Sequence, residues 1–315
     1  MSTFIDKIIL SDRAIDKKIL PSNTDVFVVS AYTVGEFNGN DKVVAIVGPR
    51  IMAKKCVNMS FPSLKLFQLT SAGFDGVPCE VYASKGVAVA NAGSVYSVPI
   101  AETVVFGMLQ VAKRLRKNPN NRRFKLTRGY RYITELADKN VLVMGAGNIG
   151  TAVAERLVGF NVNVDGYDPY CPEKKPYKCL LRSRDELIEN LGKYDYIVSA
   201  LPDNEQTKQF INKELFDVMK KNAVIVNVGR KAVFDEDALY GALKSKRIGG
   251  AVLDMFEKFP NPITNKFRRL KNVIVLPGVS AISAELSERL ESHIVRNVSA
   301  VLSGNKPSCV VNGGK

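Results

Sequence analysis

From residue 140 onward, the chain alternates short apolar runs with segments of helical pattern. Six runs are almost continuously apolar: NVLVMGAG, NVNVDGYD, YDYIVSAL, AVIVNVG, GGAVLDMF and NVIVLPG. Such runs are typical of parallel strands that helices cover on both faces. Helical patterns lie between most of them, at 149–160, 183–192, 212–221 and 235–246. Because parallel strands need long crossover connections, this alternation predicts a doubly wound α/β sheet.

The first third of the chain carries a second set of strand candidates. They lie at 26–32, 43–48, 64–71 and 87–91. Two long helix candidates flank the six-run block, one starting near Pro99 and the other spanning 283–304. A length of 315 residues also suits two domains better than one. We therefore predict a discontinuous α/β domain of residues 1–99 and 284–315, with a second α/β domain, 100–283, inserted into it.

Two of the predicted helices start with residues typical of N-caps. Ser183 has Glu186 three residues after it, which is the spacing of a capping box. Asp235 stands before EDALYGAL, where its carboxylate can accept hydrogen bonds from free backbone N–H groups. We therefore expect helices to begin directly after these two residues.

The composition disfavours several kinds of site. The five cysteines are scattered without a C-x-x-C pair, and the chain has one histidine, so a Cys/His metal site has almost no support. We expect free thiols in a reducing, cytoplasmic setting. No segment reaches the roughly 18 uninterrupted apolar residues of a membrane span. The start, MSTFIDKIIL, carries charges within its apolar stretch, so we do not expect it to be a signal peptide.

The chain is basic, with a formal net charge of +14. The excess is densest in 113–131, which holds nine basic residues and no acid. A surface or subunit-contact arm is the first interpretation of this segment, and attraction of an anionic ligand is the second. Nucleic-acid binding is the least favoured, because Phe124 and Tyr130 do not alternate with the basic residues as a stacking platform requires.

A glycine-rich motif follows the first apolar run. GAGNIG matches G-x-G-x-x-G, opens a helical pattern, and is followed eighteen residues later by an acid that ends the next run. In a dinucleotide site the glycine backbone and the helix N-terminus hold the pyrophosphate. The acid would bind the adenosine ribose and repel a 2′-phosphate, which favours NAD over NADP. FAD, S-adenosylmethionine and a glycine turn without a ligand remain alternatives. The predicted cofactor residues are Gly145, Gly147, Asn148, Ile149, Gly150, Asp168 and Pro169.

Further motifs occur in order along nearly the whole chain. They are SAGFDGV, AE at 101–102, ELADKNVLVMGAGNIG, ALPDNEQTKQFIN, NVGRKAVFDEDAL, GGAVLDMFE and NVIVLPGVS. Through these motifs the chain resembles the D-isomer-specific 2-hydroxyacid dehydrogenases. The resemblance implies two Rossmann-like domains with a cleft at their junction, and NAD as the cofactor. It also implies a 2-oxo or 2-hydroxy acid as the substrate, and a homodimer built on the nicotinamide domain.

The resemblance assigns roles to particular residues. Arg230 in NVGR corresponds to the family's arginine that binds the substrate carboxylate and carbonyl, and a guanidinium can grip a carboxylate with two parallel donors. The turn of Ser71, Ala72 and Gly73 corresponds to the family's turn that holds the substrate carboxylate. The remaining positions, which the resemblance places around the cofactor, are Leu201, Pro202, Thr207, Val228, Gly229, Asp254 and Gly278.

Two catalytic positions of the family are changed. The family's sixth strand ends in Pro-His, where this chain has Pro277–Gly278. Phe259 stands where the family has the glutamate that holds this histidine protonated. Joint loss makes physical sense, because a glutamate without its histidine would be a buried unpaired charge. His293 lies inside a helical pattern, and we expect it to be a packed or surface side chain rather than a substitute.

The fate of the lost acid separates two hypotheses. A general acid contributes roughly 10²–10⁴-fold to a rate, so an NAD-dependent 2-oxo acid reductase could persist with Lys231 or Tyr96 as its proton donor. The second hypothesis is a catalytically degenerate NAD-binding protein with a regulatory or assembly role. The lost residues favour the second hypothesis, whereas Arg230 and the substrate turn favour the enzyme. Restoring the pair by Gly278→His with Phe259→Glu is expected to raise activity toward small 2-oxo acids.

Overall fold

The computed structural model describes residues 6–114, 133–171, 176–255 and 266–313 of the chain. The chain forms two compact units. The terminal unit comprises Met1–Tyr96 with Ser283–Lys315, and the central unit comprises Ser97–Ile282. The boundaries expected from the sequence, 99/100 and 283/284, differ from these by up to three residues. Phe259 and residues 115–131 of the basic segment lie outside the described residues.

The terminal unit is built on a five-stranded parallel sheet in the order β2-β1-β3-β4-β5. Its strands are β1 (Lys7–Ser11), β2 (Thr24–Val28), β3 (Val43–Gly48), β4 (Leu66–Leu69) and β5 (Ala88–Ala90). The sequence pattern does not predict β1, because its apolar run IIL is short and charges stand on both sides of it. β2 begins earlier and ends earlier than the expected strand 26–32.

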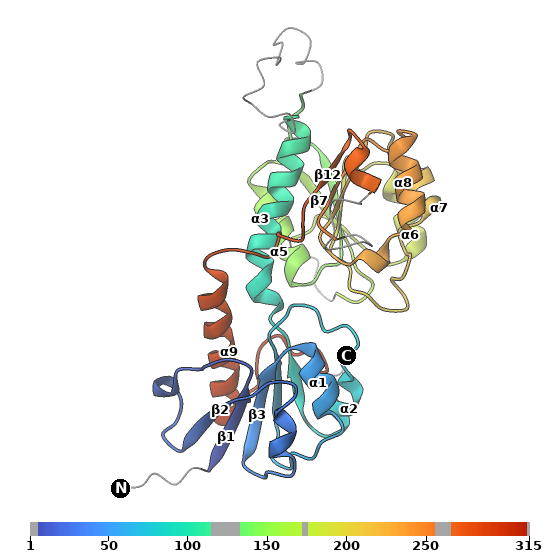
Figure 1. The fold of residues 1–315 in the computed structure, drawn as a ribbon. Coiled ribbons are helices and arrows are strands. Elements are labelled where there is room, and N and C mark those ends of the chain that lie inside the picture. Colours follow the sequence, from blue (N-terminus) through green and yellow to red (C-terminus); the bar gives the residue numbers. More distant parts are fainter. Residues whose placement is uncertain (1–5, 115–132, 172–175, 256–265, 314–315) are drawn as a thin grey trace. The chain divides into compact units, whose positions relative to one another are not determined.

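Helices cover both faces of this sheet (Figure 1). α1 (Arg50–Cys56) and α2 (Cys79–Ser84) pack on one face, around residues such as Phe67. α9 (Leu286–Leu302) packs on the other face through a stripe that includes Leu290. Apolar residues that recur every three to four positions in α9 account for this buried stripe. The helix lies within the expected segment 283–304.

His293, the chain's one histidine, lies in α9 and is only 2% exposed. Its Nε2 atom is 2.9 Å from the Asn91 carbonyl oxygen and 3.3 Å from Nδ2 of Asn297. Nδ2 of Asn297 also donates to Gln68 Oε1 at 2.6 Å and to the Ser308 carbonyl at 3.1 Å. Burial lowers the pKa of His293, although the contact with the Asn91 carbonyl opposes this shift. The histidine is therefore a packed side chain, one of the two roles that the sequence predicts.

The C-terminal segment covers one edge of the terminal sheet. Val310 forms an antiparallel bridge with Ala90 of β5, which is an edge strand. The Asn312 side chain accepts a hydrogen bond from the Val89 N–H and donates one to the Val87 carbonyl, each at 2.7 Å. The Cys309 carbonyl accepts from the Asn91 N–H at 3.0 Å. The chain thus pairs the backbone groups of its own sheet edge.

The central unit holds a seven-stranded parallel sheet in the order β12-β11-β10-β9-β6-β7-β8. Its strands are β6 (Asn140–Met144), β7 (Asn163–Tyr167), β8 (Leu180–Leu181), β9 (Tyr196–Ser199), β10 (Val224–Asn227), β11 (Gly250–Leu253) and β12 (Val273–Val275). Six of them lie within the six apolar runs, so the predicted sheet is confirmed. β8 has two residues at the edge, which is too short for a recognisable pattern. The strand order reverses between β6 and β9, and ligands of open α/β sheets bind at such switch points.

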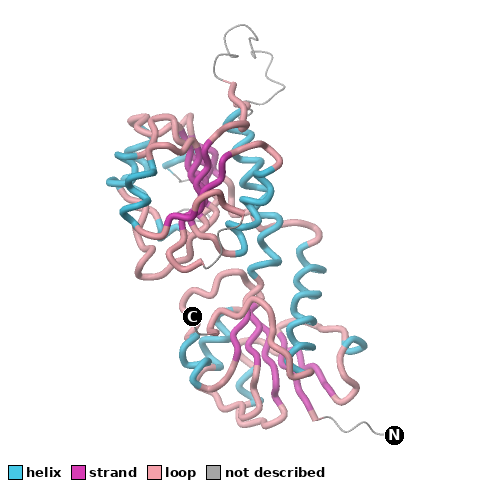
Figure 2. The backbone as a smooth tube through the Cα atoms, turned by 180° about the vertical axis from the view of Figure 1, so that it is seen from behind, coloured by secondary structure: helices cyan, strands magenta, loops and turns pink. Residues whose placement is uncertain are grey.

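Helices cover both faces of the central sheet as well. They are α3 (Gly93–Ala112), α5 (Asn148–Val158), α6 (Arg184–Leu191), α7 (Lys213–Val218) and α8 (Glu236–Lys244). In Figure 2 the strands of this unit lie between layers of helix. The helices α6, α7 and α8 pack on one apolar core, to which they contribute Leu187, Leu215 and Leu239. On α3, a Cβ at Gly107 would lie 2.9 Å from Val252 of β11, so only glycine lets this helix approach the sheet so closely.

α3 is long and apolar enough to cross a membrane by length and composition. Half of its apolar stretch is buried within the protein, as in a helix that packs inside a domain. Among the described residues it is the one helix that passes this test.

Both predicted N-caps are confirmed. The Ser183 side chain accepts a hydrogen bond from the Glu186 N–H, and the Glu186 side chain accepts one from the Arg182 N–H. Asp235 accepts from the N–H groups of Asp237 and Ala238. These contacts satisfy backbone donors that α6 and α8 leave free at their N-termini.

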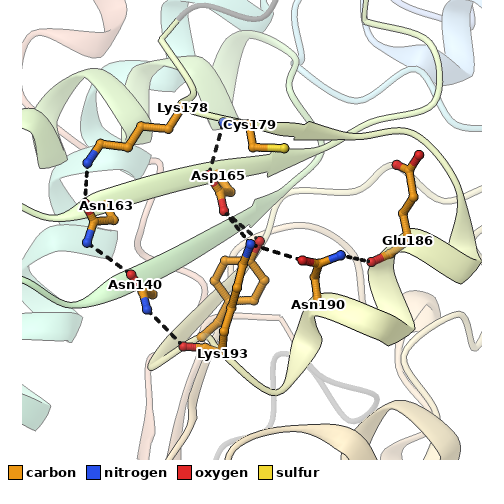
Figure 3. A network of polar contacts seen from close by, with 9 residues as sticks. Asn140, Asn163, Asp165, Lys178, Cys179, Glu186, Asn190 and Lys193 are labelled. Carbon is orange, nitrogen blue, oxygen red and sulfur yellow. Dashed lines mark hydrogen bonds and ion pairs between the residues drawn. The ribbon is translucent and has the colours of Figure 1, made fainter.

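A polar network joins the strands near β7 (Figure 3). Asp165 accepts hydrogen bonds from the Cys179 N–H at 3.1 Å and the Tyr194 hydroxyl at 2.9 Å, and Lys193 Nζ lies 3.2 Å from it. Asn140, at the start of β6, donates to the Lys193 carbonyl at 3.2 Å. The network ties the segments before β8 and β9 to β7, and it satisfies a mostly buried carboxylate.

Candidate functional site: the carboxyl edge of the central sheet

The glycine turn joins the end of β6 to the start of α5. Gly145 has φ +95, and a Cβ there would lie 3.0 Å from the Ala200 backbone. A Cβ at Gly150 would lie 1.9 Å from the Gly145 carbonyl oxygen. Open space surrounds the Cβ position of Gly147, the N-cap residue of α5. The turn therefore presents bare backbone and the helix N–H groups of Asn148 and Ile149, which is the arrangement that holds a pyrophosphate.

Asp168 follows β7 and lies beside this turn. Its Oδ2 atom accepts a hydrogen bond from the Ala146 N–H at 2.9 Å. Its Oδ1 atom accepts from the N–H groups of Tyr170 at 2.9 Å and Cys171 at 3.1 Å, across Pro169. A carboxylate has about four acceptor sites. Three of them accept backbone N–H groups here, so Oδ2 can accept one more hydrogen bond, from a ribose hydroxyl.

Arg182 is a cation at this position that the sequence motif does not reveal. Its Nη1 atom donates to the carbonyl of Cys171 and, at 3.4 Å, to the carbonyl of Asp168. The dinucleotide motif extends only to the acid and the residues directly after it. Arg182 reaches the site because it follows β8, the short edge strand without a pattern of its own.

At the other side of the switch point, the end of β10 contacts the end of β9. A Cβ at Gly229 would lie 2.8 Å from the Leu201 carbonyl oxygen, so glycine is required for this approach. The Asn227 side chain accepts from the Gly229 N–H at 3.2 Å and donates to the Met255 carbonyl at 3.0 Å. These contacts fix the backbone that carries Val228 and Gly229 between the two strand ends.

Arg230 comes directly after this glycine. It is half-buried, and its Nη1 donates to the Gly229 carbonyl at 3.1 Å. A guanidinium has five N–H donors in a fixed fork geometry. Lys231 begins the short helix η4 (Lys231–Val233) and is exposed. The two cations thus lie next to each other at the carboxyl edge of the sheet.

Asp254 and Gly278 follow β11 and β12. Asp254 is 3% exposed and accepts a hydrogen bond from the Val279 N–H at 3.0 Å and another from the Ser280 hydroxyl. Gly278 has φ +72, a conformation that L side chains rarely adopt. The turn therefore differs in its backbone from what a histidine prefers, and Asp254 holds it in this form. Ser280 is a neighbour of Asp254 that the sequence motifs do not single out.

The loop after β9 carries Pro202 and Thr207. The Thr207 hydroxyl donates to the Pro202 carbonyl at 2.7 Å, and the Thr207 N–H donates to Asn204 Oδ1 at 3.0 Å. Leu201 is buried at the end of the strand. Thr207 is therefore a residue that fixes the shape of this loop beside the glycine turn.

In the terminal unit, the turn of Ser71, Ala72 and Gly73 follows β4. The Ser71 hydroxyl donates to the Gly73 carbonyl at 2.8 Å, and Asn91 Nδ2 donates to the Ala72 carbonyl at 2.7 Å. The Tyr96 hydroxyl donates to the Thr70 carbonyl at 2.8 Å, and burial raises the pKa of Tyr96. The carbonyls of this turn are therefore engaged by side chains of the same unit.

Among the described residues, no group of three or more His, Cys, Asp or Glu side chains could hold a metal ion. The described cysteines are free thiols. Burial raises the pKa of Cys56 to about 12, so that thiol is a packing group and not a nucleophile.

Comparison with known proteins agrees with this geometry. A family model described as the NAD binding domain of D-isomer specific 2-hydroxyacid dehydrogenases matches residues 104–280. D-3-phosphoglycerate dehydrogenase of Methanocaldococcus jannaschii is 32% identical over 94% of this chain, which spans 57% of that protein's length. Glyoxylate reductase of Thermofilum pendens is 31% identical over 80% of this chain and 76% of its own length.

A solved structure shows the same fold over nearly the whole chain. It is an NADPH-dependent glyoxylate/hydroxypyruvate reductase from Sinorhizobium meliloti, in complex with NADP and malonate. The TM-score is 0.70 at 24% identity, with 97% of each chain covered. Together with the sequence matches and the glycine turn of the central unit, this likeness leads to one conclusion. The chain belongs to the D-isomer specific 2-hydroxyacid dehydrogenase family, and residues 104–280 correspond to its nicotinamide-cofactor domain.

Proposed function

We propose that this protein is an NAD-dependent oxidoreductase that interconverts a 2-oxo acid and a D-2-hydroxy acid with an unusual proton donor. One observation carries the proposal. The carboxyl edge of the central sheet has a glycine turn that a Cβ would close, together with the acid Asp168 and the guanidinium Arg230. A protein that only bound a dinucleotide would have less use for the guanidinium.

Each part of this edge has a defined task. A bound nicotinamide supplies or accepts the hydride. Arg230 binds the substrate carboxylate with paired donors and polarises the adjacent carbonyl. Asp254 accepts hydrogen bonds from the Val279 N–H and the Ser280 hydroxyl and so keeps the turn after Gly278 in place. Together these residues orient a 2-oxo acid, and orientation alone supplies a large share of a rate.

The proton donor that we propose is Lys231. It is exposed beside Arg230, so it can exchange its proton with water. Tyr96 is the other candidate. Its hydroxyl donates to the Thr70 carbonyl and its pKa is raised by burial, which makes it a weaker acid. The geometry therefore favours Lys231, and Lys231→Met is expected to lower kcat more than Tyr96→Phe does.

The cofactor that we propose is NAD, because Asp168 would repel a 2′-phosphate. Arg182 reduces this preference, since its guanidinium lies at the carbonyls of Asp168 and Cys171. NADP remains the alternative, and the structurally similar reductase from Sinorhizobium meliloti was crystallised with that cofactor. Titration with NADH and NADPH measures the preference directly.

The assembly that we propose is a homodimer. Phe106 of α3 is 52% exposed and Val158 of α5 is 60% exposed. Glu102 and Arg156, on the same two helices, are 3.6 Å apart, so these helices are neighbours. We propose that these two side chains belong to the surface that another chain covers. Light scattering with Phe106→Asp would show a monomer if this surface forms the dimer.

A catalytically degenerate NAD-binding protein is the second candidate. The backbone of Gly278 supports this candidate, because its φ of +72 is a conformation that a histidine would rarely adopt. Such a protein would bind NADH with normal affinity and turn over no 2-oxo acid.

A substrate panel decides between the two candidates. Glyoxylate, hydroxypyruvate, phosphohydroxypyruvate, pyruvate and phenylpyruvate would each be mixed with NADH, and the nicotinamide absorbance followed. We expect turnover of at least one acid, and its loss in Arg230→Ala with partial rescue in Arg230→Lys. NADH binding without turnover on the whole panel would establish the second candidate instead.

A further inference from the structure

Two segments flank the glycine turn at the carboxyl edge of the central sheet. β7 and β9 lie on either side of β6, and all three strands are parallel. The Asp168 turn (168–171) follows β7, and the Pro202 loop (202–208) follows β9. Because parallel strands end at one edge, both segments border the glycine turn. A dinucleotide whose phosphates lie on that turn must pass its adenosine half between them.

Each flanking segment is held by its own hydrogen bonds. Asp168 accepts three backbone N–H groups, of which two belong to its own turn. In the Pro202 loop, the Thr207 hydroxyl donates to the Pro202 carbonyl, and Asn204 Oδ1 accepts from the Thr207 N–H and the Gln206 N–H. Each segment therefore keeps its own shape. If the two segments move relative to each other, only the contacts that join them need to break.

One contact beside these segments and one between them differ in character. The rings of Tyr167 and Phe210 lie 5.5 Å apart, and Tyr167 is buried. This apolar contact belongs to the core. The Tyr170 hydroxyl donates to Gln206 Oε1 at 2.6 Å, and the Tyr170 side chain is 57% exposed. The second contact is a hydrogen bond between neutral groups at the surface, so water can replace it readily.

We propose that Tyr170 and Gln206 form a latch across the adenosine half of the dinucleotide site. The latch opens when a dinucleotide enters and frees the Tyr170 ring to stack on the adenine. This inference rests on the proposed function, because it needs a dinucleotide at the glycine turn.

The geometry supports such a latch in two ways. Neighbouring strands lie about 4.8 Å apart, so the ends of β7 and β9 are separated by roughly 10 Å. A tyrosine and a glutamine that extend toward each other can span that distance, and the bond then passes across the end of β6. Stacking on an aromatic ring suits adenine, since every base has a π face. The hydrogen bond is therefore placed to limit entry of the dinucleotide, and the Tyr170 ring is placed to stack on its adenine.

The latch is tested by NADH association in the full chain. Stopped-flow fluorescence would compare the native protein with Tyr170→Phe and Gln206→Ala. Each variant removes the bond, and Tyr170→Phe keeps the ring. A surface hydrogen bond of ordinary strength favours the closed form over the open form by about fivefold. We therefore expect NADH association to be about fivefold faster in each variant. The double variant should be no faster than either single one.

Two controls locate the effect. Tyr240→Phe removes a hydroxyl from α8 in the same unit and should leave association unchanged. ADP-ribose carries the adenosine half without the nicotinamide, so its displacement of NADH should shift by the same factor as NADH binding itself. Tyr170→Ala, which also removes the ring, should bind both ligands roughly tenfold more weakly than Tyr170→Phe does.

The outcomes separate the latch from the proposed function. Native rates in both Tyr170→Phe and Gln206→Ala, or effects that add in the double variant, would overturn the latch while the dinucleotide site stands. An effect on NADH without one on ADP-ribose would also overturn it. A native protein that binds neither ligand would overturn the latch and the proposed function together.

Discussion

The two ends of the proposed cofactor groove differ in what holds them. At the adenosine end, after β6 and β7, the groove is made of backbone: a glycine turn, a helix N-terminus and a carboxylate held by N–H groups. At the proposed catalytic end, after β11 and β12, the resemblance to the family predicts a site made of side chains, and at two of those positions the sequence has Gly278 and Phe259. A site made of backbone persists as long as the fold does. A site made of side chains can be rebuilt in place.

The largest expected effect tests the adenosine end. Gly150→Ala would place a Cβ 1.9 Å from the Gly145 carbonyl oxygen, so the turn must move. Overpacking of this kind costs about 1–3 kcal/mol, and we expect NADH affinity to fall on the order of 100-fold. Isothermal titration measures the loss. Gly241→Ala is the matched control, because open space surrounds that position in α8. Unchanged affinity in Gly150→Ala would show that the dinucleotide binds elsewhere.

The next effect tests the catalytic end. Gly278 has φ +72, so Gly278→Ala and Gly278→His should each lower the free energy of unfolding by roughly 1–2 kcal/mol. Urea denaturation followed by circular dichroism measures this. Gly159→Ala is the control, since Gly159 has φ −65 and needs no special backbone. The strain also sets a limit on the gain in activity expected from Gly278→His with Phe259→Glu. A stable Gly278→His variant would mean that the turn relaxes freely.

A smaller effect sharpens the choice of cofactor at the adenosine end. Arg182 donates to the carbonyls of the Asp168 turn and would lie beside a 2′-phosphate. We expect Arg182→Ala to weaken NADPH binding about fivefold and to change NADH binding little, because only NADPH carries the extra charge. Equal losses for both cofactors would point to a role in holding the turn.

The smallest effect concerns pH and separates catalysis from stability. His293 is the chain's one histidine, and its pKa is lowered by burial in the folded chain. The unfolded chain therefore binds more protons below its own histidine pKa of about 6.5. Stability should be full above that pH and fall as the pH drops toward the lower folded value. Proton NMR can follow this single imidazole directly.

The same histidine should leave catalysis unaffected. His293→Gln should flatten the pH dependence of unfolding and leave the pH profile of kcat/KM as it is. A change in that profile would mean that His293 takes part in proton transfer after all.

Local patterns predict much of this molecule. The β6–glycine–α5 sequence and the caps at Ser183 and Asp235 involve residues within a few positions of each other, so a pattern can show them. β1 and β8 escape prediction because their apolar runs are short and other strands determine them.

Features made by distant residues are harder to predict. Arg182 reaches the Asp168 turn through β8, and Asp254 bonds to Ser280 from a neighbouring strand. Gly278 has φ +72 in the same turn, next to the Val279 N–H that Asp254 also accepts. The resemblance predicts a histidine at this position, but only tertiary contacts show how the turn at Gly278 is held.

The segment that pairs Val310 with β5 has a consequence for handling this protein. Proteolysis or truncation before Ser308 would strip the cover from an edge strand and expose unpaired amide groups along it. Such an edge recruits strands from other molecules and seeds aggregation. An affinity tag at the C-terminus is therefore best separated by a spacer from Asn312, whose side chain bonds to that strand and the segment before it.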